Sequence, residues 1–271
     1  MKVKDHFLSQ EWFELVSDPD LRAFRTDPVP KDLAPYYNSE QYRSHLERPT
    51  TLVDKIYNLT KALRLKIRFD EVLRSCPNPV ALLDVGCGDG AFLAYCNRRL
   101  ERVVGVETND KARAIAANKG LTIFDSLDSV QGRFDVITLW HVLEHLPNPK
   151  EVVVSLSKLL NDNGVILIAV PNVDSWDRHH YKSYWAGFDV PRHLWHFSTH
   201  SFQPLIKDTS LIQVATKSQH LDLFYVAYLS ERYRSSRFPL LKGVVVSLVG
   251  LLSLKAVKRP SALLAVLKSA K

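Results

Sequence analysis

The chain has 271 residues, a length that suits one medium-sized α/β domain with additions. Its hydrophobic fraction of 46% and charged fraction of 24% are ordinary for a globular protein and exclude a disordered or fibrous chain. The Lys and Arg residues behind the net charge of +7 are scattered, which predicts a solvated basic surface and gives no sign of a nucleic-acid-binding tract.

The cysteines and the first residues indicate a reducing compartment. Cys76, Cys87 and Cys96 are odd in number and form no Cys-x-x-Cys pair, so we expect buried thiols, with neither a disulfide framework nor a zinc site. Residues 1–10 are charged and lack an apolar core, unlike a signal peptide. We therefore expect a cytoplasmic protein.

The first 75 residues divide into two parts. Residues 1–50 are polar and rich in proline, which argues against long helices there. Residues 51–75 carry apolar side chains close to a helical spacing, with Lys and Arg between them, and we predict one amphipathic helix.

From residue 81 onward, short apolar runs alternate with helical patterns. The predicted strands are 81–85, 102–107, 121–124, 134–139 and 165–170, and the predicted helices are 91–100, 111–118 and 151–160. Such alternation indicates parallel strands with right-handed crossovers, and near-continuous apolar strands indicate helices on both faces. We therefore predict a doubly wound sheet over about 78–172. Further along we expect a loop rich in His and aromatic residues, a helix, a strand, an apolar segment and a last strand, at 174–200, 201–208, 211–216, 238–257 and 262–267.

The first strand ends in a glycine-rich turn, Gly86-Cys-Gly-Asp-Gly90. Glycine permits a tight turn and a close ligand, and open α/β sheets bind ligands at the carboxyl ends of their strands. The spacing differs from the Gly-x-Gly-x-x-Gly of dinucleotide binders. Glu107 ends the second strand, where a carboxylate can accept hydrogen bonds from both ribose hydroxyls. The pair indicates an adenosyl ligand without phosphate; NAD, or a tight turn without ligand, are the alternatives.

Four segments in this order resemble the motifs of class I methyltransferases that use S-adenosylmethionine (SAM). They are Leu82-Leu-Asp-Val-Gly-Cys-Gly-Asp-Gly90, Val104-Gly-Val-Glu107, Phe134-Asp-Val-Ile-Thr-Leu-Trp-His-Val-Leu-Glu-His-Leu-Pro-Asn148 and Gly164-Val-Ile-Leu-Ile-Ala-Val-Pro-Asn172. Segments 36–45 and 188–198 are also similar to a subgroup near ubiquinone-biosynthesis and sugar- or lipid-cluster methyltransferases. The resemblance covers about residues 36–215.

The resemblance implies a Rossmann-like, mostly parallel seven-stranded sheet whose last strand is antiparallel, here 262–267. We expect residues 1–75 to form a lid and residues 76–271 to form a SAM-binding methyltransferase domain, with an acceptor loop at 174–200 and an apolar helical insertion at 238–257. The expected SAM contacts come from the loops that follow the strands and from the lid: Asp84, Gly86, Cys87, Gly88, Gly90, Glu107, Asp125, Ser126, Trp140, His141, Tyr37 and Tyr42. For the two tyrosines, ordinary surface packing is the alternative.

Histidines supply the candidates for proton transfer. His141 and His145 lie four residues apart after the fourth strand, where a helix would put them on one face. An oxygen or nitrogen acceptor can need a general base, so we predict a catalytic role for both, with a structural role for His145 as the alternative. His-Val-Leu-Glu-His is not the zincin order, and we expect no metal.

The segment after the fifth strand holds the candidates for acceptor binding. A basic, aromatic wall suits a sugar, an aromatic ring or an anionic head group, whereas local packing is the alternative. The predicted substrate-binding residues are His179, Tyr181, Arg192, His193 and His196.

The apolar segment 238–257 has two open interpretations. It either packs on the domain or a partner subunit, or lies in a membrane interface with its lysines reaching the head groups, as a peripheral contact. Its longest charge-free run, 243–254, would span about 18 Å as a helix, less than a bilayer core of about 30 Å.

The sequence thus predicts a SAM-dependent methyltransferase acting on a small molecule, by O-methylation of a sugar, quinone precursor or lipid-linked metabolite. A nicotinamide-dependent oxidoreductase and a non-catalytic SAM-binding scaffold are the alternatives. A nucleic-acid substrate is disfavoured, because no Asn/Asp-Pro-Pro-Tyr type of motif follows the fourth strand.

Overall fold

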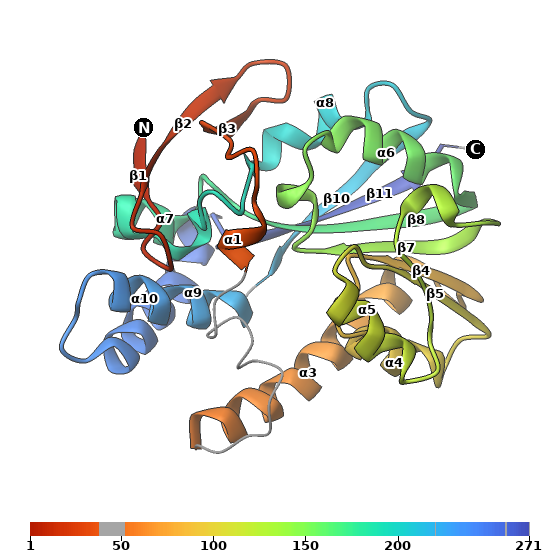
Figure 1. The fold of residues 1–271 in the computed structure, drawn as a ribbon, viewed down its shortest axis with the longest axis horizontal. Helices are drawn as coiled ribbons and strands as arrows, with labels where there is room; N and C mark the ends of the chain where they lie inside the picture. Colours follow the sequence, from red (N-terminus) through yellow and green to blue (C-terminus); the bar gives the residue numbers. More distant parts are fainter. Residues whose placement is uncertain (38–51, 220, 258, 271) are drawn as a thin grey trace.

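Seven strands form a twisted sheet with helices on both faces in the computed structural model, which describes residues 1–37, 52–219, 221–257 and 259–270 (Figure 1). Across the sheet the strands are β10 (Leu211–Gln219), β11 (Ala262–Ser269), β8 (Leu160–Pro171), β7 (Phe134–Trp140), β4 (Ala81–Val85), β5 (Arg102–Val106) and β6 (Thr122–Phe124).

The direction of the strands confirms the predicted topology. β6, β5, β4, β7 and β8 pair in parallel, whereas β11 pairs antiparallel with both β8 and β10. The chain leaves β4 toward β5 on one side and reaches β7 on the other. This reversal of direction places the ligand-binding crevice at the carboxyl ends of β4, β5 and β7.

Two groups of helices bury the two faces of the sheet (Figure 1). α3 (Leu52–Ser75), α4 (Ala91–Asn97) and α5 (Asp110–Ala117) lie on one face, where Phe69, Phe92 and Ala116 join one apolar core. α6 (Pro149–Lys158) and α8 (Phe202–Ile206) cover the other, with Leu156 and Phe202 in a second core. Local signals fix the helix starts: the side chain of Asn109 accepts hydrogen bonds at the start of α5, and Pro149 opens α6.

A second, small sheet was not predicted. β1 (Lys2–Lys4), β2 (Trp12–Asp18) and β3 (Ala23–Asp27) pair in order, and β3 also pairs with β9 (Trp195–His196) from the predicted acceptor loop. Phe13 and Leu15 of β2 are buried while their neighbours face solvent. This period-two alternation indicates a strand, but no strand was predicted in the proline-rich residues 1–50.

The remaining differences concern boundaries and one missed helix. The prediction that a helix extends to residue 160 was wrong, because α6 ends at Lys158 and Leu160 already pairs with Phe134 as the start of β8. After β10 the chain forms α9 (Leu221–Tyr233), which was not predicted, and α10 (Pro239–Val257), which covers the predicted apolar segment. No helix in the described part of the chain is long and apolar enough to cross a membrane.

Candidate functional site

The glycine-rich turn joins β4 to α4 in a left-handed backbone. Gly86, Gly88 and Gly90 have φ angles of 69°, 55° and 71°, which favour glycine over residues with a side chain. A Cβ on Gly86 would lie 2.4 Å from Cγ2 of Val142, so the turn and the loop after β7 approach each other closely. Cys87 is buried under the turn, and its backbone N–H bonds the carbonyl of Val106. The turn is thus a backbone cradle next to β5 and the loop after β7.

Glu107, directly after β5, is bound to that turn. Its Oε2 accepts the backbone N–H of Gly88 at 2.8 Å, and its Oε1 accepts that of Asn109 at 2.8 Å. A carboxylate oxygen can accept more than one hydrogen bond, so both oxygens retain capacity for two vicinal hydroxyls. The structure brings the predicted acid and the predicted turn together.

Asp84 lies below the turn at the end of β4 and is buried. Burial raises the pKa of Asp84 to about 7, although the hydrogen bond from the Thr138 hydroxyl, at 2.6 Å, acts to lower it. Trp140 ends β7 with a buried ring, 4.9 Å below the guanidinium of Arg68 in α3. The indole N–H of Trp140 has no hydrogen-bond partner among the described residues, which suits a site that receives a ligand.

A small pocket opens beside Trp140 at the carboxyl ends of β7 and β8. The guanidinium groups of Arg64 and Arg68 in α3 and the carboxylate of Asp222 in the first turn of α9 line its wall, so the pocket carries both signs of charge. Its polar lining residues are Arg64, Arg68, Trp140, His141, Gln219 and Asp222.

His141 lies between two carboxylates. Its Nε2 is 3.0 Å from Oδ2 of Asp222, and its Nδ1 is 3.3 Å from Oε1 of the fully buried Glu144. Burial lowers the pKa of His141, but the hydrogen bond and charge of Asp222, with Glu144 on the other side, raise it to about 10. Because carboxylates only accept, both ring nitrogens donate, and His141 is an imidazolium at neutral pH.

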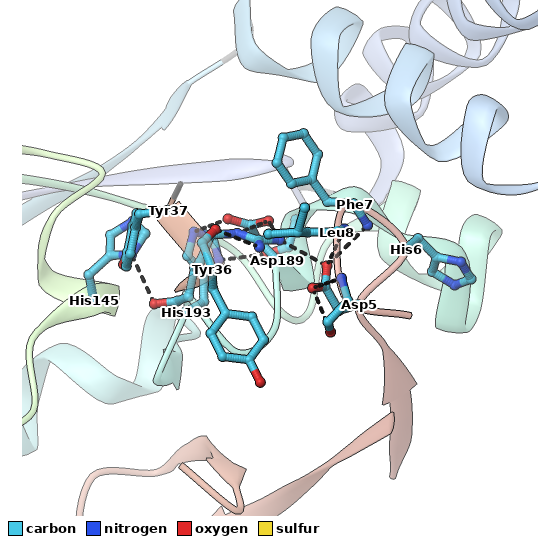
Figure 2. A network of polar contacts seen from close by, with 12 residues as sticks. Asp5, His6, Phe7, Leu8, Tyr36, Tyr37, His145, Asp189 and His193 are labelled. Atoms are coloured by element: carbon cyan, nitrogen blue, oxygen red, sulfur yellow. Dashed lines mark hydrogen bonds and ion pairs between the residues drawn. The ribbon is translucent and has the colours of Figure 1, made fainter. Parts of the chain in front are cut away.

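His145 follows in a 3-10 turn, and its ring is held by a backbone carbonyl. Nδ1 lies 2.9 Å from the oxygen of Arg192 and 3.1 Å from the hydroxyl of Tyr37 in α1 (Ala34–Tyr37), a contact that Figure 2 shows. A carbonyl oxygen only accepts, so Nδ1 carries a proton, and in the neutral tautomer this leaves the lone pair on Nε2.

His193 repeats this arrangement beside His145. Its Nδ1 is 3.0 Å from the carbonyl oxygen of Gly187, and its ring centroid is 4.7 Å from that of His145. Burial, followed by the neighbouring His145, lowers the pKa of His193 to about 4. His193 is therefore neutral at neutral pH, with a second basic nitrogen next to the first.

Three of these side chains can offer ligand atoms to one cation. Glu144, His145 and His193 each have one such atom, and the three lie within 4.8 Å of one another. Oε1 of Glu144 faces Nδ1 of His141, and its Oε2 has no hydrogen-bond partner among the described residues. Two imidazoles and a carboxylate are donors that first-row transition metals accept, although the sequence order led us to expect no metal. Metal binding and proton transfer would use the same imidazole lone pairs.

Other predicted acceptor residues lie apart from this group. Arg192 is fully buried and donates to Asp189 at 2.6 Å and to Asp5 at 3.0 Å, so it joins the loop to the N-terminal sheet. Tyr181 is buried in the core between that sheet and α9. His179 is exposed on α7 (Trp176–Tyr181), and its Nδ1 contacts the carbonyl of Ser175 in the same segment.

His196 lies in β9 and bonds across the small sheet. Its Nε2 is 2.9 Å from Oγ1 of Thr26, whose hydroxyl donates to the carbonyl of His193. The His196 nitrogen must therefore donate. Burial, with the nearby His193, lowers the pKa of His196 to about 3, so the ring is neutral.

Asp125 and Ser126, two further predicted cofactor residues, lie beside the crevice. Asp125 is exposed directly after β6, and the Ser126 hydroxyl caps a 3-10 turn by accepting the N–H of Asp128. Tyr37 reaches His145, as described. Tyr42 lies outside the described residues. The cofactor roles of these residues stay predictions.

Two carboxylates that bind the basic residues of this region were not identified from the sequence. Asp222 belongs to the helix that was not predicted, and Asp5 lies in a segment interpreted as lid. One signal was available for Asp222: it is a single acid among the apolar residues 221–227. An isolated charge in such a run usually has a buried partner.

Solved structures share the fold. The cyclopropane synthase MmaA2 from Mycobacterium tuberculosis superposes with a TM-score of 0.56 at 14% identity, covering 89% of this chain and 99% of that chain. The plantazolicin methyltransferase BpumL in complex with SAH gives a TM-score of 0.54 at 15% identity, covering 87% and 93%.

Several relatives by sequence carry the same name. The ubiquinone biosynthesis O-methyltransferase of Alkalilimnicola ehrlichii is 28% identical over 144 residues, or 48% of this chain and 56% of the relative. That of Idiomarina loihiensis is 29% identical over 147 residues, or 49% and 58%. The aligned part of the chain thus spans little more than half the length of these curated relatives.

A family-level comparison covers the crevice itself. The family described as methyltransferase domain matches residues 53–211, which run from α3 through β4, β5 and β7 to the start of β10. With more than half of its residues inside that match, including the glycine turn, Glu107 and the histidine group, this chain belongs to the methyltransferase-domain family.

Proposed function

We propose that this chain transfers a methyl group from SAM to a small-molecule acceptor. The proposal depends on one contact: the backbone N–H of Gly88, in the left-handed turn at 86–90, donates a hydrogen bond to the carboxylate of Glu107. This contact places the backbone of the turn beside two carboxylate oxygens, an arrangement that suits the ribose of an adenosyl group. When bound, SAM would supply a methyl group activated by the positive charge on its sulfur. The neutral thioether that departs needs no acid to protonate it.

The surroundings of the turn fit the rest of that cofactor. Gly86 faces Val142 so closely that only a residue without Cβ fits, whereas a Cβ on Gly88 would meet nothing within 4 Å, so the backbone at Gly88 is open to a ligand. Arg64 and Arg68 bring positive charge to the pocket beside Trp140, complementary to the carboxylate of a methionine end. Asp125 and Ser126 follow β6 at the same edge, where an adenine would lie in this assignment.

We assign O-methylation as the reaction, with His145 as the base. Nε2 of His145 has a lone pair fixed by the Arg192 carbonyl, and it accepts the hydroxyl proton as the acceptor oxygen forms its bond to the methyl carbon. Holding acceptor, methyl and sulfur in line supplies much of the remaining rate. The relatives named ubiquinone biosynthesis O-methyltransferases support an aromatic hydroxyl, such as that of a quinone precursor.

Calorimetric titration tests the cofactor assignment. We expect SAH to bind the native chain, and Glu107→Ala to weaken it by at least about tenfold, since it removes two charge-assisted hydrogen bonds. Asp110→Ala, an exposed acid three residues away, is the matched control and should leave binding unchanged. Preferential binding of NAD, or SAH binding unaffected by Glu107→Ala, would contradict the proposal.

A second measurement separates an enzyme from a scaffold. Incubation with SAM and hydroxylated aromatic acceptors, followed by mass spectrometry, should reveal a product heavier by one methylene. Tight SAH binding without transfer to any hydroxyl, amine or carbon acceptor in a broad panel would favour the non-catalytic alternative.

A further inference from the structure

In α10 the small residues face the protein and the large apolar residues face solvent, which is the reverse of an ordinary surface helix. Small residues form the face toward α9: Gly243, Ser247 and Gly250 are buried. A Cβ on Gly243 would lie 3.0 Å from the Tyr228 backbone, and one on Gly250 would lie 3.2 Å from Leu223. The hydroxyl of Ser247 is satisfied within its own helix by the carbonyl of Gly243. The backbone of α9 thus lies against Gly243 and the side chain of Leu223 against Gly250, and most of the described large apolar side chains of α10 remain exposed.

The outward face carries the large apolar side chains. Their spacing follows the helical period, so they form one continuous stripe rather than isolated exposures. Leu241 and Leu252 are 65% and 70% exposed. The exposed members are Leu240, Leu241, Val244, Val245, Leu248, Val249 and Leu252. A contiguous stripe of this kind on a water-facing helix marks an interaction surface.

Charge identifies the kind of partner. Lys and Arg are scattered through the chain, but acids are not: residues 232–271 contain nine Lys or Arg and no Asp or Glu. Residues 1–231 contain 27 and 29, so the whole positive excess lies in the part that includes α10. Arg232, Arg237 and Lys242 are exposed where α9 turns into α10.

We propose that the outward face of α10 docks on an anionic lipid membrane surface. Apolar side chains flanked by Lys and Arg, in a stretch of residues 232–271 that contains no Asp or Glu, match an interfacial helix whose stripe enters the acyl boundary while its cations meet anionic head groups. A protein partner would need an equally apolar, acidic face. The surface lies outside residues 53–211 and outside the proposed catalytic group, so docking does not depend on methyl transfer.

Vesicle flotation with the full chain tests the proposal without any methyl acceptor. We expect the native chain to float with vesicles of phosphatidylcholine and phosphatidylglycerol and to remain below vesicles of phosphatidylcholine alone. The triple variant Leu241→Gln, Val245→Gln and Leu248→Gln should bind at least tenfold less. The triple variant Val16→Gln, Ile212→Gln and Val214→Gln, which removes exposed apolar residues elsewhere, should bind as the native chain does.

Charge variants separate the electrostatic part. Each cation near such a surface contributes about fivefold in affinity, so Arg232→Gln, Arg237→Gln and Lys242→Gln together should lower binding at least about tenfold. Arg22→Gln, Lys31→Gln and Arg98→Gln remove the same charge from other exposed sites and should not. Thermal unfolding verifies that every variant is folded.

Two outcomes would overturn the docking proposal. One is equal flotation of the native chain and the α10 variants. The other is a dimer in light scattering that the Leu241, Val245 and Leu248 substitutions dissociate, which would make this face an interface between copies. Either result leaves SAH binding, and so the proposed function, untouched.

Discussion

At the scale of single residues, His141 is the side chain whose environment departs furthest from the sequence-based expectation. It was a candidate base, yet Asp222 and Glu144 hold both ring nitrogens as donors. A cation at this place stabilises the buried Glu144 and fixes the start of α9. We therefore assign His141 a positioning and electrostatic role, and the base function to His145.

Stability should depend on pH through the pair formed by His141 and Asp222. The folded-state pKa of His141, raised to about 10, lies above its unfolded value near 6.5. The pair therefore contributes fully below about pH 6.5 and loses its contribution as the pH rises toward 10. Because the pair is partly exposed, Asp222→Asn should cost about 2 kcal/mol at pH 6.5, and progressively less toward pH 10. Urea unfolding across this range measures the difference, and a difference independent of pH would contradict the assignment.

Loss of the base should lower turnover and spare the cofactor. His145→Gln should reduce kcat for methyl transfer by roughly 100-fold to 10,000-fold, the usual contribution of a general base. SAH affinity should change less than about twofold, because the proton is taken from the acceptor and not from the cofactor. His200→Gln, an exposed histidine of the same chemistry, serves as the control. An unchanged kcat in His145→Gln would remove the base role.

Contacts between residues could be predicted where the order of the strands along the chain determines which residues lie close together. The turn at 86–90 and Glu107 follow neighbouring parallel strands, so the sequence predicted that they meet, and they do. His141 and Asp222 are 81 residues apart, and Arg192 and Asp5 are 187 apart. Those pairings depend on how a loop and a small sheet fold back on the domain, which no local spacing contains.

At the scale of elements, the turn between β4 and α4 combines backbone conformation with packing. Gly88 and Gly90 both have left-handed φ angles, but a Cβ on Gly88 would meet nothing within 4 Å. A Cβ on Gly90 would lie 2.7 Å from Leu121 and 2.8 Å from the Cβ of Ala116. The two positions therefore separate conformational strain from overpacking.

Substitution by alanine should resolve these two effects. Gly90→Ala is expected to lower the free energy of unfolding by about 1–3 kcal/mol more than Gly88→Ala, because it adds overpacking against α5 and the β6 side of the sheet. Chemical denaturation of both variants gives the comparison. Equal losses would show that the backbone angle alone decides.

Elements with a strong period were predicted, and weak ones were not. Apolar strands such as β4 and β7 are buried along all or nearly all of their length, so their composition alone identified them. β9 has two residues, and its partner β3 lies far away in the chain, so neither shows a clear signal. The missed α9 carries apolar residues around its circumference, because it packs against both α10 and the loop at 186–188.

At the scale of the whole molecule, one buried ion pair joins the small sheet to the large domain. Asp5 accepts the N–H groups of Phe7, Leu8 and Ser9 and also binds Arg192, which binds Asp189 (Figure 2). Arg192 in turn offers its carbonyl to His145. The N-terminal strands are thereby connected to the proposed base through one residue.

Breaking this link should affect both stability and activity. Asp5→Asn is expected to cost about 3 kcal/mol, since it removes one partner of a buried charge. The fall in kcat should exceed the fall in SAH affinity, because the disturbance reaches His145 and not the glycine turn. Glu14→Gln, an exposed acid on β2, is the control. Loss of SAH binding with unchanged kcat would contradict the connection.

The position of β11 has a consequence for biosynthesis. This strand is synthesised after β8 and β10, yet it lies between them and supplies hydrogen bonds to both. During synthesis on the ribosome, the edges of β8 and β10 that pair with β11 therefore lack their hydrogen-bond partners until residues 262–269 have left the exit tunnel. Nascent chains stalled before that point should be captured by chaperones, since bare strand edges are prone to misassociate.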